Sequence, residues 1–188
     1  SYQIARTLDV KCEEKVLDVC SAPGTKAMTL AQFMNNRGTI DCLDIHEHRV
    51  QLIKKDAKRL HVDIIHAYCK DATKILDLGL YDRVLCDVPC SGYGVLARKP
   101  DIKLRMKSED MDSLIKIQRE ILASAASHVK ENGCLVYSTC TLNKKENEKQ
   151  IEYFIKNHPE FALEKEETLF PNEYSGGFFI AKLVRNTH

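Results

Sequence analysis

Two cysteines in this sequence stand where a short apolar run gives way to small and polar residues. Cys90 follows the run 82–87, and Cys140 follows the run 134–138. A cysteine thiolate adds to an electron-poor carbon and can later leave it, which suits covalent catalysis. A lone cysteine is more often buried filler. Because neighbouring parallel strands end at the same edge of a sheet, we expect both thiols to share one pocket there.

Four acidic residues follow the ends of successive predicted strands, namely Asp18, Asp44, Asp71 and Asp87. A single acid at such a position is more often a helix cap or turn residue, but four in succession weaken that reading. Asp44 lies about 20 residues beyond Gly24, the spacing at which an acid binds ribose hydroxyls. The loop 18–26 has one glycine, so it lacks both the dinucleotide fingerprint and a P-loop. It fits a nucleoside without a pyrophosphate, and S-adenosylmethionine is the candidate.

The elements that must position these residues are predicted from hydrophobic patterning. Apolar runs typical of buried strands alternate with stretches of helical period. We expect strands over 15–20, 39–44, 63–68, 82–87 and 134–138, helices over 25–36, 47–60, 108–131 and 144–157, and two final strands near 161–163 and 178–184. Ser108 is expected to cap the third helix and Gly133 to follow its end, and Asn143 with Glu146 resembles a capping box for the fourth. The order predicts a doubly wound α/β fold, with a mostly parallel sheet and one antiparallel strand near the C-terminus.

Composition narrows the classes of protein. The 188 residues are 44% hydrophobic, and no stretch approaches the ~18 apolar residues of a membrane helix. The start shows no signal-peptide pattern, and the eight cysteines form no C-x-x-C pair. We therefore expect a reduced, cytoplasmic monomer with neither metal nor membrane contact. The formal net charge is +1, so any basic surface must be local. One basic run is present, with members Arg98, Lys99, Lys103, Arg105 and Lys107.

Three motifs carry a resemblance to a known family. The segments 18–26, 87–92 and 137–141 resemble the signature motifs of the Sun-type (Nop/Sun) RNA cytosine-C5 methyltransferases. The sequence is most similar there to the bacterial small-subunit ribosomal RNA enzymes. We expect residues 1–188 to form the catalytic domain, without the amino-terminal RNA-binding region that family members carry. Three positions depart from the family pattern: Thr25 and Ala27 in the first loop, and Gly176 before the Gly-Phe-Phe turn.

The resemblance implies a Rossmann-like class I methyltransferase that uses S-adenosylmethionine. It implies that Cys140 is the nucleophile that attacks cytosine C6, that Cys90 assists release, and that Asp87 hydrogen-bonds the cytosine edge. Lys26 could neutralise the loop or the adduct, or be a surface lysine. The cofactor-binding residues that it implies are Cys20, Ser21, Ala22, Pro23, Gly24, Thr25, Lys26, Asp44, Arg49, Asp71 and Asp87.

The RNA partner is expected to be ribosomal, with transfer RNA as the alternative substrate. The basic run either binds RNA phosphates or forms a solvated face. An alternative from another class is a ribosome-assembly factor that binds RNA without turnover, which the presence of both Cys90 and Cys140 argues against. Cysteine-protease chemistry is disfavoured because no histidine follows a strand end that faces Cys140. A nicotinamide dehydrogenase is disfavoured because the glycine fingerprint is missing.

Overall fold

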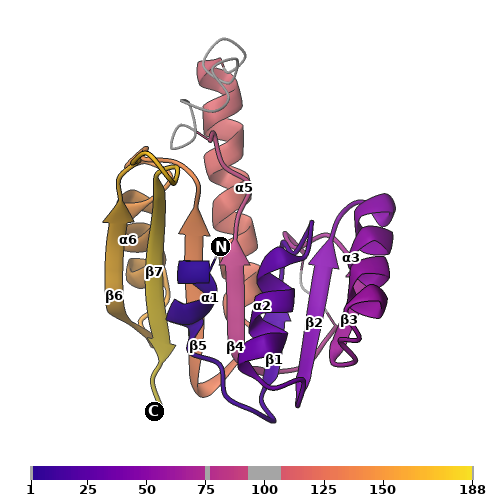
Figure 1. Cartoon of the computed structure of the whole chain (residues 1–188). Coiled ribbons are helices and arrows are strands. Elements are labelled where there is room, and N and C mark those ends of the chain that lie inside the picture. The colour runs from indigo at the N-terminus through magenta and orange to yellow at the C-terminus, as the bar shows by residue number, and fades with distance from the viewer. Residues whose placement is uncertain (1, 75–76, 93–106, 188) are drawn as a thin grey trace.

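A computed structural model describes residues 2–74, 77–92 and 107–187. Its seven strands form one sheet, in the order β3-β2-β1-β4-β5-β7-β6 (Figure 1). The elements are α1 (Tyr2–Leu8), β1 (Lys15–Asp18), α2 (Thr25–Phe33), β2 (Thr39–Asp44), α3 (Glu47–Arg59), β3 (Ile65–Cys69), β4 (Tyr81–Asp87), α5 (Ser108–Ala126), β5 (Val129–Thr139), α6 (Glu148–Asn157), β6 (Phe161–Leu169) and β7 (Phe178–Arg185).

The strand directions confirm the predicted fold class. Strands β1 to β5 pair in parallel, and β7 is antiparallel to both of its neighbours, β5 and β6. From β1 the chain winds outward through β2 to β3, and then returns to β4 on the other side of β1. The strand order therefore reverses between β1 and β4. Ligands of open α/β sheets bind outside the carboxyl ends of the strands at such a reversal.

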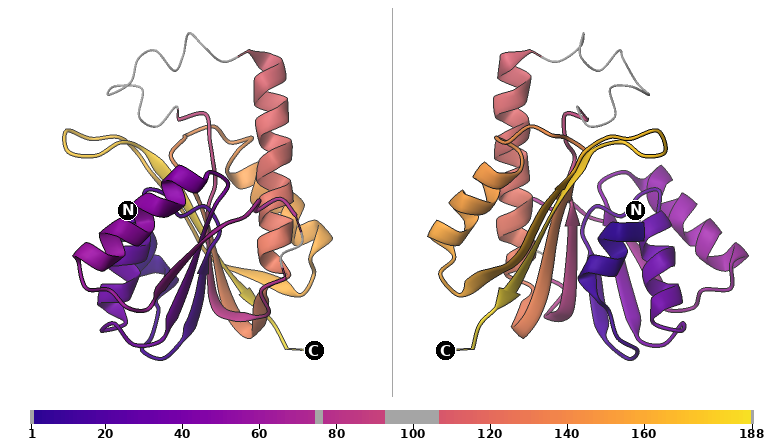
Figure 2. Two further views of the ribbon diagram at one scale, coloured as in Figure 1. Left: turned by 90° about the vertical axis from the view of Figure 1, so that its right-hand side faces the viewer. Right: turned by 60° about the vertical axis from the view of Figure 1, so that its left-hand side comes forward.

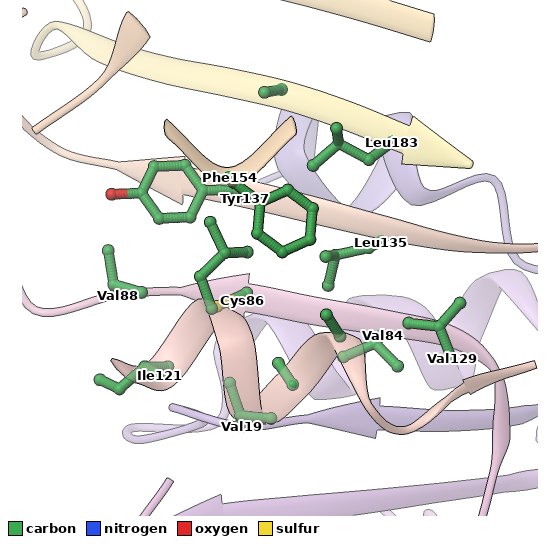
Figure 3. Close-up of a cluster of buried hydrophobic side chains, with 14 of the residues drawn as sticks. Val19, Val84, Cys86, Val88, Ile121, Val129, Leu135, Tyr137, Phe154 and Leu183 are labelled. Carbon is green, nitrogen blue, oxygen red and sulfur yellow. The ribbon is translucent and has the colours of Figure 1, made fainter. Parts of the chain in front are cut away.

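Helices cover both faces of the sheet (Figure 2). The first three, α1, α2 and α3, pack on one face, where residues such as Ile4, Leu30 and Ile53 are buried. On the other face α5 packs on β4 and β5, and α6 packs on β6 and against α5. Figure 3 shows this second cluster, in which Ile121 and Phe154 meet strand residues that include Cys86. All eight cysteines are free thiols, and Cys86 is fully buried, as the apolar run around it predicted.

Several predicted boundaries differ from the observed ones, including both boundaries at the junction of α5 and β5. The helix expected over 108–131 ends at Ala126, and β5 already begins at Val129. Val129 continues the apolar helical stripe in sequence, but it is buried because it pairs with Tyr81 in the sheet. Gly133 consequently lies inside β5, where a β-carbon would come 2.7 Å from a backbone oxygen. The helix starts at Ser108 as predicted, but the capping role expected of Ser108 is wrong, because the N-cap residue is Lys107.

Candidate active site

A cavity of about 300 Å³ opens where the carboxyl ends of β1, β2 and β4 meet. Three of the four strand-end acids line it: Asp44, Asp71 and Asp87. Asp18 does not, because its side chain is buried below the loop and neither carboxylate oxygen has a hydrogen-bond partner among the described residues. Burial raises the pKa of Asp18 to about 7, against the effect of the nearby Lys26 ammonium. Asp18, which is not among the predicted cofactor-binding residues, thus does not face the cavity.

The loop after β1 brings backbone close to the cavity. Cys20 and Ala22 line its wall, whereas Ser21 is buried and Pro23 is exposed. Gly24 has φ 102°, and a β-carbon there would lie 3.2 Å from Ile53 Cγ1. A side chain at this position would therefore be strained and crowded. Gly24, Thr25 and Lys26 do not line the cavity, but α2 begins three residues after Ala22, which does. The first N–H groups of a helix are free to bind an anion.

The two loop positions that depart from the family pattern lie within α2. Thr25 begins the helix with an exposed side chain, so no glycine conformation is needed there. Ala27 is fully buried in the core beneath the helix. Neither side chain lines the cavity.

Asp44 ends β2 in the position expected of a ribose ligand. Its Oδ1 accepts the backbone N–H of His46 at 2.9 Å, and Arg49 Nη1 lies 4.0 Å from its Oδ2. Asp44 is 8% exposed, and both it and Arg49 line the cavity. The carboxylate is thus fixed by a backbone contact and retains lone pairs toward the cavity.

Asp71 follows β3 and has a structural role as well as a place in the cavity wall. Its Oδ1 accepts the backbone N–H of Thr73 at 2.9 Å and the Thr73 hydroxyl at 2.7 Å. These hydrogen bonds lower the pKa of the Asp71 carboxyl. Asp71 therefore stabilises the turn after β3 and also lines the cavity in which the cofactor is expected to bind.

The sequence analysis missed the apolar part of the cavity wall. Ile45 lines it directly after Asp44, and Ile117 and Ile121 of α5 line the opposite side. The other lining residues not predicted are Val19, Lys70, Ala72, Thr73, Val88 and Pro89. No signal in the sequence marks this wall, because Ile117 has the spacing of a core residue of α5 and only the structure shows that it is 40% exposed. An apolar wall for a base, an acid for ribose and a helix start for a carboxylate fit an adenosyl amino acid such as S-adenosylmethionine.

Cys90 and Cys140 lie together beside this cavity rather than in its wall. The backbone N–H of Cys140 donates to the Cys90 sulfur at 3.2 Å, so the loops after β4 and β5 meet at the two thiols. Cys140 is exposed and Cys90 is half-buried. The Cys90 thiol donates to the Cys140 sulfur, which lowers the pKa of Cys140 although burial opposes this, and raises the pKa of Cys90. Cys140 is therefore the more readily ionised of the pair.

We expect this asymmetry to appear in alkylation rates. Iodoacetamide should modify Cys140 with a half-maximal rate below pH 9, the ordinary thiol pKa from which that of Cys140 is lowered. Cys69 is the control, because it is also exposed but desolvation and Glu47 raise its pKa. Rates per cysteine can be followed by peptide mass spectrometry across pH. Identical pH profiles for the two cysteines would refute the asymmetry.

Asp87 connects the cavity to the cysteine pair. Its Oδ2 lies 2.6 Å from Lys26 Nζ, and its Oδ1 accepts the Ser138 hydroxyl at 2.7 Å. Burial alone would lower the pKa of Lys26, but Asp87 and Asp18 raise it overall. Lys26 is thus a fixed cation and not a surface lysine. A half-buried ammonium and a carboxylate at the edge of β4 can stabilise charge that develops on a bound base.

The predicted RNA-binding run is mostly not described. Arg98, Lys99, Lys103 and Arg105 lie outside the described residues. Lys107 is exposed, and its backbone N–H donates to Asp110 Oδ2 at 3.1 Å at the start of α5. Elsewhere, the described part of the chain contains no group of acidic, histidine or cysteine side chains that could hold a metal ion. It also contains no helix long and apolar enough to cross a membrane.

Comparison with known proteins places the chain in a family. The sequence pattern described as "16S rRNA methyltransferase RsmB/F" matches residues 5–184. The Bacillus subtilis protein named "Probable ribosomal RNA small subunit methyltransferase B" is 48% identical over 88% of this chain and 38% of its own length. The tRNA (cytosine(72)-C(5))-methyltransferase of Pyrococcus horikoshii is 31% identical over 97% of this chain and 50% of its own length.

Solved structures agree with this placement. The crystal structure of NSun6 from Pyrococcus horikoshii with SFG superposes with a TM-score of 0.90, at 30% identity over all of this chain and 52% of that one. The chain thus spans about half or less of the length of these relatives. On the matched span and the level of identity, the chain belongs to the RsmB/F family of 16S rRNA methyltransferases.

Proposed function

We propose that this chain methylates C5 of cytosine in RNA, with S-adenosylmethionine as methyl donor. The observation that carries the proposal is the arrangement of two thiols and an ion pair beside one cavity: Cys140 next to Cys90, and Lys26 on Asp87. Cytosine C5 is too weak a nucleophile to accept a methyl group directly. A thiolate that adds to C6 pushes electron density onto C5, and cysteine can both add and leave.

Each step of the proposed methyl transfer is assigned to a residue of this site. The Cys140 thiolate forms a bond to C6, and the electron pair displaced from the C5–C6 double bond is delocalised over the ring. With the methyl donor bound, C5 would then take its methyl group, and the bond between that methyl and the donor sulfur would break with its electrons left on the sulfur. In the release step a base takes the proton on C5, the double bond re-forms, and the bond between Cys140 and C6 breaks with its electrons left on the Cys140 sulfur. We assign Cys90 to this release step. Asp87 and Lys26 would bind the N3 and N4 edge and stabilise the adduct.

The methyl donor is assigned to the cavity lined by Asp44, Asp71 and Ile117. The support is the fit of its acid, its apolar wall and the helix start, together with the SFG bound by the Pyrococcus horikoshii relative, which is an analogue of S-adenosylmethionine.

Asp44→Ala should weaken the binding of S-adenosylmethionine. The loss of charge-assisted hydrogen bonds to ribose should cost about 1.5–3 kcal/mol, or roughly ten- to a hundredfold in affinity. Calorimetric titration measures this directly. Asp56→Ala is the matched control, since Asp56 lies on the surface of α3 and pairs only with Arg59 among the described residues. Equal affinity in the Asp44 variant would remove Asp44 from the site.

For the substrate we propose small-subunit ribosomal RNA, with transfer RNA as the alternative because relatives bear both names. The reaction would take place in the cytoplasm, where the free cysteines stay reduced. We propose that the chain acts as a monomer on single-stranded or flipped-out cytosine. The test is methylation of unmodified 16S rRNA and unmodified tRNA with labelled donor, followed by mapping of the product base. Methyl transfer to tRNA alone would make tRNA the substrate in place of ribosomal RNA. The absence of 5-methylcytosine from both RNAs would contradict the proposal.

A further inference from the structure

Among the described residues, Glu146 is the buried carboxylate that accepts the most side-chain and backbone hydrogen bonds, and it lies behind the two cysteines. Glu146 was predicted to belong to a capping box, but α6 begins only at Glu148 and the N-cap residue is Asn147. The Glu146 side chain instead turns inward and is 0% exposed. Among the described residues no lysine, arginine or histidine forms an ion pair with it. A buried carboxylate without a counter-ion is costly unless hydrogen bonds stabilise it.

Four donors converge on Glu146. Its Oε1 accepts the backbone N–H of Ser91 at 2.9 Å and the Gln118 side-chain N–H at 3.1 Å. Its Oε2 accepts the Ser91 hydroxyl at 2.6 Å and the Asn143 side-chain N–H at 3.0 Å. All four partners donate and none accepts. These four donors are all satisfied only if both terminal atoms of the side chain at position 146 accept hydrogen bonds. A carboxylate has two such oxygen atoms.

These bonds fix Cys90 on both sides along the chain. Ser91, directly after Cys90, is bound to Glu146 through both its backbone and its side chain. Gln118 of α5 donates to the carbonyl oxygen of Pro89, directly before Cys90, at 2.9 Å, as well as to Glu146. Gln150 in turn donates to Gln118 Oε1 at 3.1 Å and so fixes the orientation of that amide. Hydrogen bonds thus hold the residues directly before and directly after Cys90, and this fixes the position of Cys90.

The adjacent residue does the same for Cys140. Asn147 Nδ2 donates to the carbonyl oxygen of Thr141 at 2.9 Å, and Asn147 Oδ1 accepts the Thr139 hydroxyl at 2.5 Å. Thr139 and Thr141 flank Cys140. The two halves are also joined, because the Ser91 hydroxyl oxygen lies 3.0 Å from Thr141 Oγ1. One turn, residues 146–147, therefore holds the chain on either side of both thiols.

We propose that Glu146 is a positioning residue that holds the Cys90 thiol against Cys140, so that Cys90 can serve the release step. This inference rests on the proposed function for its catalytic consequence, but the geometry it asserts can be measured without RNA. Glu146 reaches the cysteines only through Ser91 and Gln118, and it acts by fixing where the Cys90 sulfur stands. Asn147 supplies the matching restraint on Cys140.

The test uses Glu146→Gln, which keeps the shape of the side chain but replaces an acceptor oxygen by a donor. Facing four donors, glutamine leaves at least one of them unsatisfied, and the loop at Ser91 should shift. Cys90 then no longer hydrogen-bonds the Cys140 sulfur, so the pKa of Cys140 should rise. The alkylation midpoint of Cys140, which is the pH of its half-maximal alkylation rate, should therefore move to higher pH. A purely electrostatic role predicts the opposite, since a removed negative charge would move that midpoint to lower pH. Glu152→Gln on the exposed face of α6 is the matched control and should leave the midpoint unchanged.

With RNA and donor present, Glu146→Gln should still transfer one methyl group but release the RNA slowly. Covalent complex should therefore accumulate, at least several-fold more than in the Glu152→Gln control. If Glu146→Gln does not fold, Ser91→Ala carries the test, because it removes one of the four donors and should shift the Cys140 midpoint in the same direction. A midpoint that stays or falls in the folded variants would overturn the inference even if methylation itself is confirmed. A raised midpoint without methylation of any RNA would leave the positioning role intact and refute the proposed function.

Discussion

Cys90→Ala is expected to stop after one round of methyl transfer and to remain covalently attached to its RNA. The alanine removes the group assigned to release, while Cys140 is still free to attack C6. Turnover should fall by about a thousandfold or more, yet the amount of methyl transferred should approach one per protein. Under denaturing electrophoresis the protein should migrate as a shifted band that carries labelled RNA.

Cys140→Ala is the partner experiment and should show neither methylation nor a shifted band. Cys69→Ala serves as the control, because Cys69 is an exposed free thiol on β3 away from the pair. A shifted band in Cys140→Ala and none in Cys90→Ala would reverse the two roles. Adducts in neither variant would leave both cysteines structural and favour the non-catalytic RNA-binding alternative.

Asp87→Asn is expected to lower the rate of methyl transfer by roughly 10²–10³-fold at saturating donor and RNA. Asparagine cannot hold the ion pair that Asp87 makes with Lys26 at 2.6 Å. Burial would then lower the pKa of Lys26 with less opposition, and the site would lose both a fixed cation and an acceptor for the cytosine edge. Single-turnover measurements isolate this step from release.

The control for this variant lies on the same strand. Asp82→Asn at the other end of β4 also breaks an ion pair, with Lys130 at 3.2 Å, but lies far from the carboxyl edge of the sheet. It should leave single-turnover rates unchanged. A loss of less than tenfold in Asp87→Asn, or a loss confined to donor affinity, would contradict the role assigned to Asp87 and Lys26.

Much of this site could be predicted because it lies at strand ends. Asp44 and Asp87 end β2 and β4, and Cys140 follows β5 by one residue, so alternating apolar runs were enough to place them at one edge. Local sequence patterns did not predict the contacts of a side chain that also binds residues far away in the sequence. Asn143 and Glu146 have the spacing of a capping box, and the two side chains do hydrogen-bond, but the other donors to Glu146 come from residues distant in sequence.

The cavity wall escaped prediction for a related reason. Ile117 and Ile121 have the spacing of core residues on an amphipathic helix, and spacing alone does not show which of them faces a ligand. Ile121 is buried, whereas Ile117 is 40% exposed toward the cavity. The start of β5 was missed because Val129 fits the helical stripe and the strand equally well. In each case the deciding contact is made by residues that are far away along the chain.

The bond that we propose between Cys140 and cytosine C6 can be tested directly by locating the covalent adduct in tryptic peptides. RNA that carries 5-fluorocytosine in place of cytosine should remain bound after methyl transfer, since the fluorine at C5 cannot leave as the proton does. Trypsin cuts after Lys130 and Lys144 and after Arg83 and Arg98, so Cys140 and Cys90 fall in separate peptides. We expect the nucleotide mass on the peptide 131–144, with fragmentation placing it on Cys140 and not on the buried Cys134. Nucleotide mass on the peptide 84–98 instead, at Cys90, would contradict the proposed bond.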